Sequence, residues 1–546
     1  MVWGVTKPHD MSSGLVNDSV RDRTIPSTLR LSEETAAYVI AGFGTLVAAV
    51  NIWRNHLFLH DDAFISLRYA KHFVEHGDLS WNLGDRVEGY TNFLYVIMTS
   101  FLLEMGITPV LAIQLINILS AIALVAAVVF AARRIMPEAP NLQALAYAAV
   151  VCNVSLSVWV FGGLEAPVVA ALLAWGMALS VCYFQRLNRP QTNGLAAFTG
   201  VFFAAAALVR PDAVIVIAAF SLALFFFGAG RASKRFARMI VAGGIPLLAV
   251  LVHMIWRLDY YGDFLPNTFH AKVGLELGHR LQKVSEYLVV TGALYLPVLS
   301  LAGLAFIVAA FHRQTSRLAS GLVFTILGFL LYVTWSGGDH MAASRVILPI
   351  VGFAAILLVV SIRALPERLR TYAILGSLCL FALSAINARS FKMDWAAFNG
   401  TIVGKYIATA WPAGSLVGLN TAGSTPFYAD NHVYIDMLGL NDRTIAKRED
   451  VPVLARRQRM PGHAKGDGAY VLSRKPDYII FGGSEGIDIV DAEKWFLTGV
   501  ELRGDPEFQT CYEKATQQLP VPEDMRRSGR PGDPIVFTYY RRTCPT

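Results

Sequence analysis

The chain has 546 residues, of which 54% are hydrophobic and only 16% are charged, and its mean hydropathy is +0.46. Soluble domains carry about 25% charged residues, so this composition excludes a soluble globular protein. The formal net charge of +7 would suggest nucleic acid in a soluble protein. In a membrane protein it reflects basic loops that face anionic lipid, so we expect no nucleic-acid partner.

Residues 1–35 are polar and basic, and they predict a cytoplasmic N-terminal tail without a cleavable signal peptide. Apolar runs then recur up to residue 389, and crossing a bilayer takes about 20 apolar residues. We predict a polytopic α-helical membrane module over residues 36–389, with about eleven spans. The spans lie at 36–53, 108–132, 143–161, 168–185, 194–209, 213–229, 239–256, 290–311, 318–335, 346–362 and 371–388. The apolar stretch 91–105 is about 15 residues long, which suits a re-entrant or interfacial helix better than a span.

The basic residues of the predicted turns give the orientation. With the N-terminus inside, every cytoplasmic turn is basic, as the positive-inside rule requires. These turns carry Arg133 and Arg134; Arg186 and Arg189; Arg231, Lys234, Arg235 and Arg238; Arg313 and Arg317; and Arg363, Arg368 and Arg370. Counting 91–105 as a span would place these clusters outside the cell. The odd number of spans instead puts residues 390–546 on the extracytoplasmic side of the inner (plasma) membrane.

The loops of the predicted extracytoplasmic face differ from the basic cytoplasmic turns, because both acidic and basic residues, with other polar ones, lie at their span ends. The first external loop, about 54–90, is the longest between spans. The face carries His60, Asp61, Asp62, Glu88, Glu165, Arg210, Asp212, Asp263, Asn267, Lys272, Asp339, His340 and Arg345. A charge at the bilayer centre costs at least about 2.5 kcal/mol, and less at the interface, so such residues are functional candidates. A single helix-end carboxylate could also be a solvated cap, but five loops converge on this face.

The adjacent carboxylates of Asp61 and Asp62 could act as a general base, as metal ligands, or as both. Asp62, Ile65 and Tyr69 have helical spacing, so we expect Asp62 to cap an interfacial helix and Asp61 to perform chemistry. His60, Asp61 and Asp62, together with Asp339 and His340, could bind a divalent cation. No metal-binding spacing supports such a site.

Residues 390–546 have an ordinary globular composition. Short apolar runs at 415–419, 433–437, 478–481 and 535–540 predict strands, and hence a small soluble α/β domain. The glycine-containing segment 418–423 lacks the signature of a phosphate loop and predicts a turn that closes the first strand. Cys511 and Cys544 could form a disulfide if the domain is extracytoplasmic, whereas the other three cysteines lie in apolar runs as packed thiols. We expect the domain to recognise an acceptor or to be structural.

Several of these motifs carry a family resemblance. The run from Asp61 to Ala70, the Trp81–Asn82 pair and the segment 88–92 resemble the first periplasmic loop of GT-C class membrane glycosyltransferases. Within that class, the closest resemblance is to the mycobacterial terminal arabinofuranosyltransferases. Further matches are 163–165, 210–212, 260–263, 265–268, 337–339, Arg345 and 435–442, so the likeness follows most of the chain in order.

The resemblance implies a transferase that moves a sugar from a polyprenyl-phosphate donor to an extracytoplasmic acceptor hydroxyl on a cell-envelope glycan or glycolipid. It implies inversion at the anomeric carbon, with Asp61 as the base and Asp62 as the alternative. The anionic leaving group calls for cations at span ends, which Arg210 and Arg345 supply, with Lys272 and His340 as helpers. Each arginine could instead be an interfacial anchor. The residues that could bind sugar or acceptor hydroxyls are Glu88, Glu165, Asp212, Asp263, Asn267 and Asp339. Glu88, Glu165 and Asp263 could also neutralise the arginines.

Three alternatives remain open at this point. Arabinofuranose is the sugar that the resemblance favours, but no motif separates it from mannose or aminoarabinose, or pentosyl from hexosyl transfer. A transporter or translocase of a lipid-linked sugar would place polar groups near the bilayer midplane and often shows repeated halves, and the sequence shows no repeat. A structural scaffold would not need the clustered carboxylates.

Overall fold

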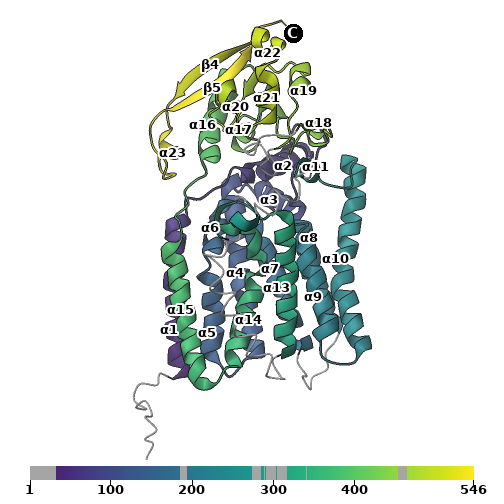
Figure 1. Cartoon of the computed structure of the whole chain (residues 1–546), viewed down its shortest axis with the longest axis vertical. Helices are drawn as coiled ribbons and strands as arrows, with labels where there is room; N and C mark the ends of the chain where they lie inside the picture. The colour runs from purple at the N-terminus through teal and green to yellow at the C-terminus, as the bar shows by residue number, and fades with distance from the viewer. Residues whose placement is uncertain are drawn as a thin grey trace, which may run out of the picture.

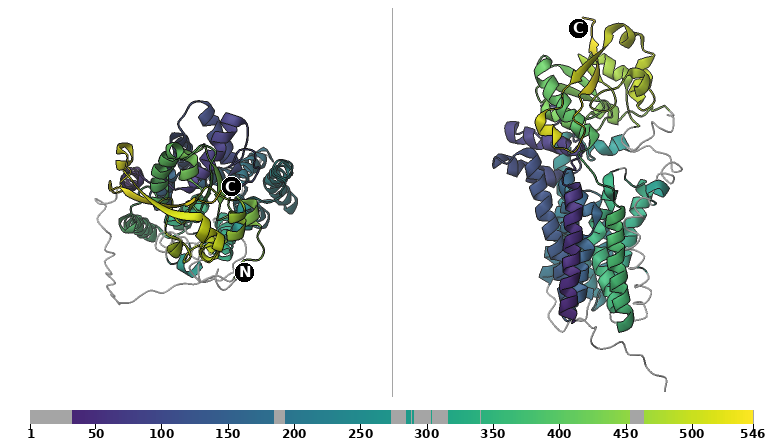
Figure 2. Two further views of the ribbon diagram at one scale, coloured as in Figure 1. Left: turned by 90° about the horizontal axis from the view of Figure 1, so that it is seen from above. Right: turned by 90° about the vertical axis from the view of Figure 1, so that its left-hand side faces the viewer.

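The computed structural model describes residues 32–184, 193–272, 284–287, 289, 303, 316–339, 341–452 and 464–545. Long helices run side by side, and a domain with a small sheet lies against one end of them (Figures 1 and 2). The apolar composition of the long helices and the mixed composition of the domain account for this division. The protein is therefore a polytopic helical membrane protein with a C-terminal soluble α/β domain, as the sequence predicts.

The bundle follows the apolar runs closely. Its described helices are α1 (Glu33–Asn55), α4 (Pro109–Ile135), α5 (Pro140–Val151), α6 (Val154–Gly162), α7 (Ala166–Ser180), η2 (Val181–Phe184), α8 (Asn193–Val209), α9 (Ala213–Phe227), α10 (Ala232–Tyr261), α13 (Ser316–Ser336), η3 (Ala342–Ile350), α14 (Val351–Arg363) and α15 (Glu367–Asn387). Among the described residues, seven helices are long and apolar enough to cross a membrane, or eight if the bent α5–α6 pair counts as one span. The predicted count of about eleven also included α8 and α9, which are shorter apolar helices, and 290–311, which lies outside the described residues apart from Gly303.

The span predicted at 143–161 is broken into two helices. α5 and α6 are bent by 49° relative to one another. Asn153 causes the break, because it leaves the helix and its side chain accepts a hydrogen bond from the Leu156 amide to start α6. The second helix therefore ends beside the residues 163–165 singled out in the sequence.

The apolar stretch at 91–105 forms α3 (Phe93–Glu104), a helix of 12 residues. Such a helix is about 18 Å long, which is too short for a hydrocarbon core of about 30 Å. It packs against α2 (Asp62–His76), and both lie between the bundle and the soluble domain (Figure 1). This position fits an interfacial helix.

The basic turns lie away from the soluble domain. The α9–α10 turn, which carries Arg231, and the α14–α15 turn, which carries Arg363 and Arg368, are at the opposite end of the bundle (Figure 1). The acidic and paired polar loops lie at the domain's end. The charge asymmetry read from the sequence is thus an asymmetry between the two ends of the molecule.

The soluble domain contains a five-stranded sheet in the order β2-β1-β3-β5-β4. Its strands are β1 (Leu416–Leu419), β2 (Val433–Asp436), β3 (Tyr478–Ile480), β4 (Tyr512–Leu519) and β5 (Ile535–Arg542). β1 pairs in parallel with β2 and β3, and β5 is antiparallel to β3 and β4. The four predicted strands are confirmed. β4 was missed because it is a polar edge strand whose middle six residues are not buried.

Short helices surround the sheet and connect it to the bundle. They are α11 (Asn267–Lys272), α16 (Trp395–Ala410), α17 (Ser424–Tyr428), α18 (Arg443–Ala446), α19 (Gly468–Ser473), α20 (Ile489–Ala492), α21 (Leu497–Arg503), α22 (Pro506–Cys511) and α23 (Glu523–Arg526). α16 follows directly after the last bundle helix and packs against α17. The start of α17 is thereby fixed next to the membrane end of the domain.

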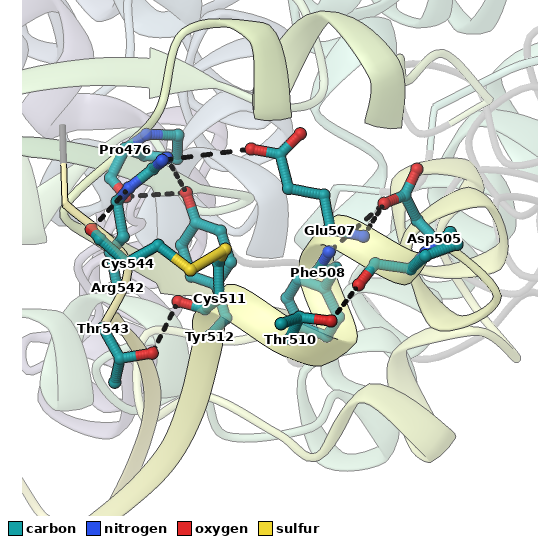
Figure 3. The surroundings of a disulfide bond; sticks show 11 residues. Pro476, Asp505, Glu507, Phe508, Thr510, Cys511, Tyr512, Arg542, Thr543 and Cys544 are labelled. Carbon is teal, nitrogen blue, oxygen red and sulfur yellow. Dashed lines mark hydrogen bonds and ion pairs between the residues drawn. A yellow bond between two sulfur atoms is a disulfide. The ribbon is translucent and has the colours of Figure 1, made fainter.

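Cys511 and Cys544 form the predicted disulfide, with their Cα atoms 4.9 Å apart. Figure 3 shows that the bond joins the end of α22 to the segment after β5, where the Thr543 amide also donates to the Cys511 carbonyl at 2.8 Å. The pair closes the β4–β5 hairpin at its open end. Cys152 and Cys182 are buried as expected, whereas Cys379 is exposed on the outside of α15 and was wrongly expected to be packed.

Candidate active site where the bundle meets the soluble domain

The Asp61 carboxylate is held by the soluble domain. Asp61, rather than the expected Asp62, occupies the N-cap position of α2, and its side chain makes no bond to that helix. Instead, Oδ1 accepts the backbone N–H of Ser424 at 2.9 Å and its hydroxyl at 2.6 Å. Asp61 is only 4% exposed. Burial raises the pKa of its carboxyl to about 6, and the two Ser424 bonds partly offset that rise.

Asp62 and His60 form the more accessible side of this centre. The Asp62 side chain is 41% exposed, and its Oδ1 lies 3.9 Å from Nδ1 of His60. That same histidine nitrogen accepts the Asp62 backbone N–H at 3.2 Å. The His60 ring lies against Trp159 of α6, with 6.0 Å between the ring centroids.

The cation site suggested for His60, Asp61 and Asp62 does not form. Among the residues that the structure describes, no group of three or more His, Cys, Asp or Glu side chains could hold a metal ion. The physical reason is that Asp61 points toward Ser424, while Nδ1 of His60 is occupied by a backbone amide.

Arg210 joins two buried carboxylates beside this centre. Its NH1 donates to Glu165 Oε1 at 2.7 Å, while Nε and NH2 donate to the two oxygens of Asp212 at 2.8 and 2.6 Å. The planar guanidinium suits this bidentate arrangement. Glu165 Oε2 also accepts from Asn92 at 3.0 Å, and Asn92 bonds to Ser66 of α2. The α8–α9 connection and the first external loop are thus linked through Arg210.

Arg345 lies beside the same carboxylates with fewer bonds. Within the described residues it makes one hydrogen bond, from Nε to Asp339 Oδ2 at 3.3 Å, and its NH1 is 3.9 Å from Glu165 Oε1. Its guanidinium lies 5.4 Å from the centroid of the Trp159 ring. Trp159 therefore has His60 near it on one side and Arg345 within cation–π distance.

The backbone that leads to Arg345 is strained. Ala343 and Ser344 have φ angles of 51° and 53°, in the left-handed region that costs a non-glycine residue about 1–3 kcal/mol. Such residues cluster at ligand and active sites, where surrounding contacts impose the conformation. The Nε1 of Trp159 donates to the Ala342 carbonyl at 2.8 Å and fixes the start of this strained segment.

Three of the residues expected to bind substrate have partners within the protein. Glu88 pairs with Arg257 of α10, with 2.5 Å between Oε2 and Nε, and burial raises the pKa of Glu88 to about 7 although Arg257 opposes the rise. Asn267 donates its side-chain amide to three carbonyls of residues 439–442. Asp263 pairs with Lys447. The structure therefore gives these three residues docking and pairing contacts. The side chains of Lys272 and His340 lie outside the described residues.

Most of the distinctive residues in the first external loop contact the soluble domain. Asp430 accepts hydrogen bonds from Lys71 and His72 of α2, at 2.6 and 2.8 Å, and forms an ion pair with Arg68 of the same helix at 2.7 Å. Trp81 donates Nε1 to the Ala422 carbonyl at 3.2 Å. Two reciprocal bonds join Asn82 to the Tyr434 backbone, at 2.8 and 3.1 Å. Tyr69 donates to Asn441 at 3.1 Å.

Sequence reasoning missed Ser424, Asp430 and Arg257. The only available signal was on α2, where Arg68, Lys71 and His72 follow helical spacing and so share one face. That face required an acidic partner, but nothing in the sequence distinguishes Asp430 from the other acids of the domain.

The comparisons with known proteins agree with this architecture. Residues 392–539 match a family model described as "Domain of unknown function (DUF8728)". No curated protein matches the chain. The chain resembles the crystal structure of ArnT from Cupriavidus metallidurans in the apo state, with a TM-score of 0.50, 12% identity, and coverage of 72% of this chain and 84% of that one. It has the fold of GT-C class proteins.

Two further solved structures are similar at lower scores. ArnT from the same organism bound to undecaprenyl phosphate has a TM-score of 0.47 and 13% identity, over 72% of this chain and 85% of that chain. The Archaeoglobus fulgidus oligosaccharyltransferase, in complex with Zn and sulfate, has a TM-score of 0.48 and 10% identity, over 73% of this chain. The match spans 62% of the length of that oligosaccharyltransferase.

Proposed function

We propose that the protein is a membrane glycosyltransferase that moves a sugar from a polyprenyl-phosphate donor to an acceptor hydroxyl outside the cytoplasm. The observation that carries the proposal is the position of Arg345 beside Trp159, with the Asp61–Asp62 pair and His60 nearby. A carboxylate base and a cation for the departing phosphate are thus present in one site at the membrane end of the soluble domain. The GT-C fold and the motif resemblance support the same class of reaction.

The proposed reaction is a single displacement. The acceptor oxygen attacks the anomeric carbon, the bond from that carbon to the phosphate oxygen breaks, and the configuration inverts. The hydroxyl proton passes to an aspartate, and the lipid phosphate leaves as an anion that Arg345 stabilises. Asp61 is the proposed base because its pKa, raised by burial to about 6, lies near neutral pH, where a general base is most effective. Asp62 is the alternative.

Two observations support an extracytoplasmic site at the plasma membrane. Disulfides persist in oxidising compartments, and the soluble domain contains one between Cys511 and Cys544. The basic turns are at the other end of the bundle, where the positive-inside rule places the cytoplasm (Figure 1). A lipid-linked donor and a cell-envelope glycan or glycolipid acceptor would meet on this side. Arabinofuranose is the sugar that we propose, on the motif resemblance alone.

The test uses purified full-length protein and polyprenyl phosphates that carry arabinofuranose, mannose or aminoarabinose. The assay measures release of the lipid phosphate in the presence of acceptor glycans, and it determines the anomeric configuration of the product. We expect release from one donor, with inversion. A translocase would release no lipid phosphate, so the absence of release from every donor would refute the proposed reaction.

Replacing the base tests the site itself. We expect Asp61→Asn to abolish transfer while the protein remains folded, and Asp62→Asn to retain at least part of it. Asp533→Asn is the control, because Asp533 is an exposed aspartate of the soluble domain. Transfer by purified Asp61→Asn at the wild-type rate would show that Asp61 is not the base.

A further inference from the structure

The soluble domain makes two hydrogen bonds to a single oxygen of the Asp61 carboxylate. Ser424 is fully buried and places both its backbone N–H and its hydroxyl on one oxygen of Asp61. The hydroxyl also lies 3.2 Å from the Ala396 carbonyl, but its single proton follows the shorter contact, 2.6 Å, to Asp61. The domain therefore fixes the orientation of this carboxylate.

The residue before Ser424 has to be glycine for the same reason. A Cβ atom at position 423 would overlap both the carboxylate and the backbone carbonyl of Asp61. The turn at 420–424 is held from behind as well, because the Asn420 side chain accepts the Gly482 amide at 2.9 Å and Thr421 donates to the Gly482 carbonyl at 2.9 Å. The turn cannot yield without disturbing the connection that leads out of β3.

The same domain is anchored on the helix that begins at Asp61. Asp430, six residues after Ser424 in the sequence, contacts three basic side chains of α2: it accepts hydrogen bonds from two of them and forms an ion pair with the third. Lys71 and His72 lie about two and a half turns from the start of α2. The domain therefore holds α2 at two points, the carboxylate at its N-terminus and the basic face further along.

We propose that the soluble domain completes the catalytic centre, with Ser424 as a positioning residue that holds the Asp61 carboxylate and Asp430 as the anchor of the domain on α2. This inference rests on the proposed function of Asp61. It gives a role to a domain whose family is described only as of unknown function. Because a base must be aligned with the acceptor hydroxyl, a misplacement of about 1 Å can cost about 100-fold in rate.

The experiment compares two buried serines of the same pocket in full-length protein. Ser484 is the matched control, because it is also buried and also donates to the Ala396 carbonyl, at 3.0 Å, but makes no contact with Asp61. We expect Ser424→Ala to lower kcat by about 10- to 100-fold with little change in the KM for the donor. Ser484→Ala is expected to keep both values.

Two further variants distinguish displacement of the turn at 420–424 from Asp61 from a general loss of stability. Gly423→Ala is expected to push the turn off Asp61 and lower kcat at least as much as Ser424→Ala does. Gly504→Ala is its control, because a Cβ there meets nothing within 4 Å. Equal kcat in Ser424→Ala and the wild type would overturn the inference. Faster transfer by Ser424→Ala would also overturn the inference, because the turn would then hinder access of the acceptor to Asp61.

Hydrogen exchange tests the contact without any sugar donor. In Asp61→Ala, the amides of 423–424 are expected to exchange faster, while those of β3 are unchanged; equal exchange in both proteins would overturn the contact. If wild-type protein releases lipid phosphate from no donor, the proposed function fails, and the exchange result still decides whether the domain holds Asp61. If the wild type is active and Ser424→Ala is equally active, only the positioning role fails.

Discussion

The two arginines of the site are expected to respond differently to truncation, because their surroundings differ. Arg210 makes three short hydrogen bonds to Glu165 and Asp212, whose side chains are 5% and 9% exposed. Arg210→Ala would leave two buried carboxylates without their cation, and breaking a buried pair in this way costs about 3–5 kcal/mol. This variant is therefore expected to lose stability before its activity can be interpreted.

Arg345→Ala removes less from the folded protein. The lost contacts are one hydrogen bond of 3.3 Å to Asp339, an ion pair of 3.9 Å with Glu165 and a cation–π contact with Trp159. Together they amount to about 2–3 kcal/mol, because the one hydrogen bond is long and the Glu165 contact is beyond hydrogen-bond distance. Its effect on the reaction is expected to be large, because a hydrogen bond to a charged group contributes about 1.5–3 kcal/mol. That energy corresponds to about a 10- to 100-fold loss in kcat/KM for the donor.

The assay pairs thermal unfolding in detergent with lipid-phosphate release. Arg541→Ala provides the control, because its side chain is 59% exposed on β5. We expect Arg345→Ala to melt somewhat below the control and to turn over the donor slowly, and Arg210→Ala to melt at a lower temperature than Arg345→Ala. Unchanged kcat/KM in a well-folded Arg345→Ala would refute the phosphate-binding role, and equal stability of the Arg210→Ala and Arg345→Ala proteins would refute the account of the ion pairs.

Three further predictions concern the soluble domain and its orientation. Cys511→Ser removes a disulfide between residues separated by 33 positions, which should lower the free energy of unfolding of the domain by about 3–4 kcal/mol. The measured result should be a lower melting temperature of the domain. Asp430 has a lowered pKa because the bonds from His72 and Lys71 and the charge of Arg68 outweigh its burial. Docking is therefore fully stabilised above the ordinary aspartate pKa and is lost as pH falls toward the lowered value. Hydrogen exchange in α2, corrected for the intrinsic exchange rate at each pH, should therefore show smaller protection factors in acid, and Asp430→Asn should flatten that dependence. In intact cells, a membrane-impermeant thiol reagent should label a cysteine placed at Ser473 but not one placed at Arg231; the reverse pattern would contradict the proposed orientation.

Local patterns predicted the parts of the fold that local physics determines. Hydrophobic runs located the bundle helices, and the length of the apolar stretch 91–105, about 15 residues, separated an interfacial helix from a span. Apolar runs located β1, β2 and β3, where consecutive residues are buried, and β5, which is buried in part. They failed for β4, whose polar side chains carry no such signal.

The candidate site could be predicted only in part, because its contacts join distant segments. Span-end motifs indicated Glu165, Arg210 and Asp212, and the structure brings these three residues together. The partner of Asp61 is Ser424, 363 residues away in the sequence, and no pattern near either residue indicates the other. Arg257 was passed over because it lies close to an apolar run, so the buried partner of Glu88 was not recognised.

The geometry of α2 would let one short motif serve both the docking of the soluble domain and the proposed chemistry. Its N-terminus carries the aspartates, while its basic residues, two turns and more further on, face the soluble domain. A helix is stiff over this length of about 15 Å, so a domain bound at Asp430 also fixes the direction in which Asp61 leaves the helix. Loosening the contact between Asp430 and α2 should therefore change the orientation of Asp61, because α2 would move as one rigid helix. On this argument, Asp430→Asn is expected to lower kcat even though Asp430 lies away from Asp61, and normal kcat in a variant with loosened α2 would show that the two ends of the helix act independently.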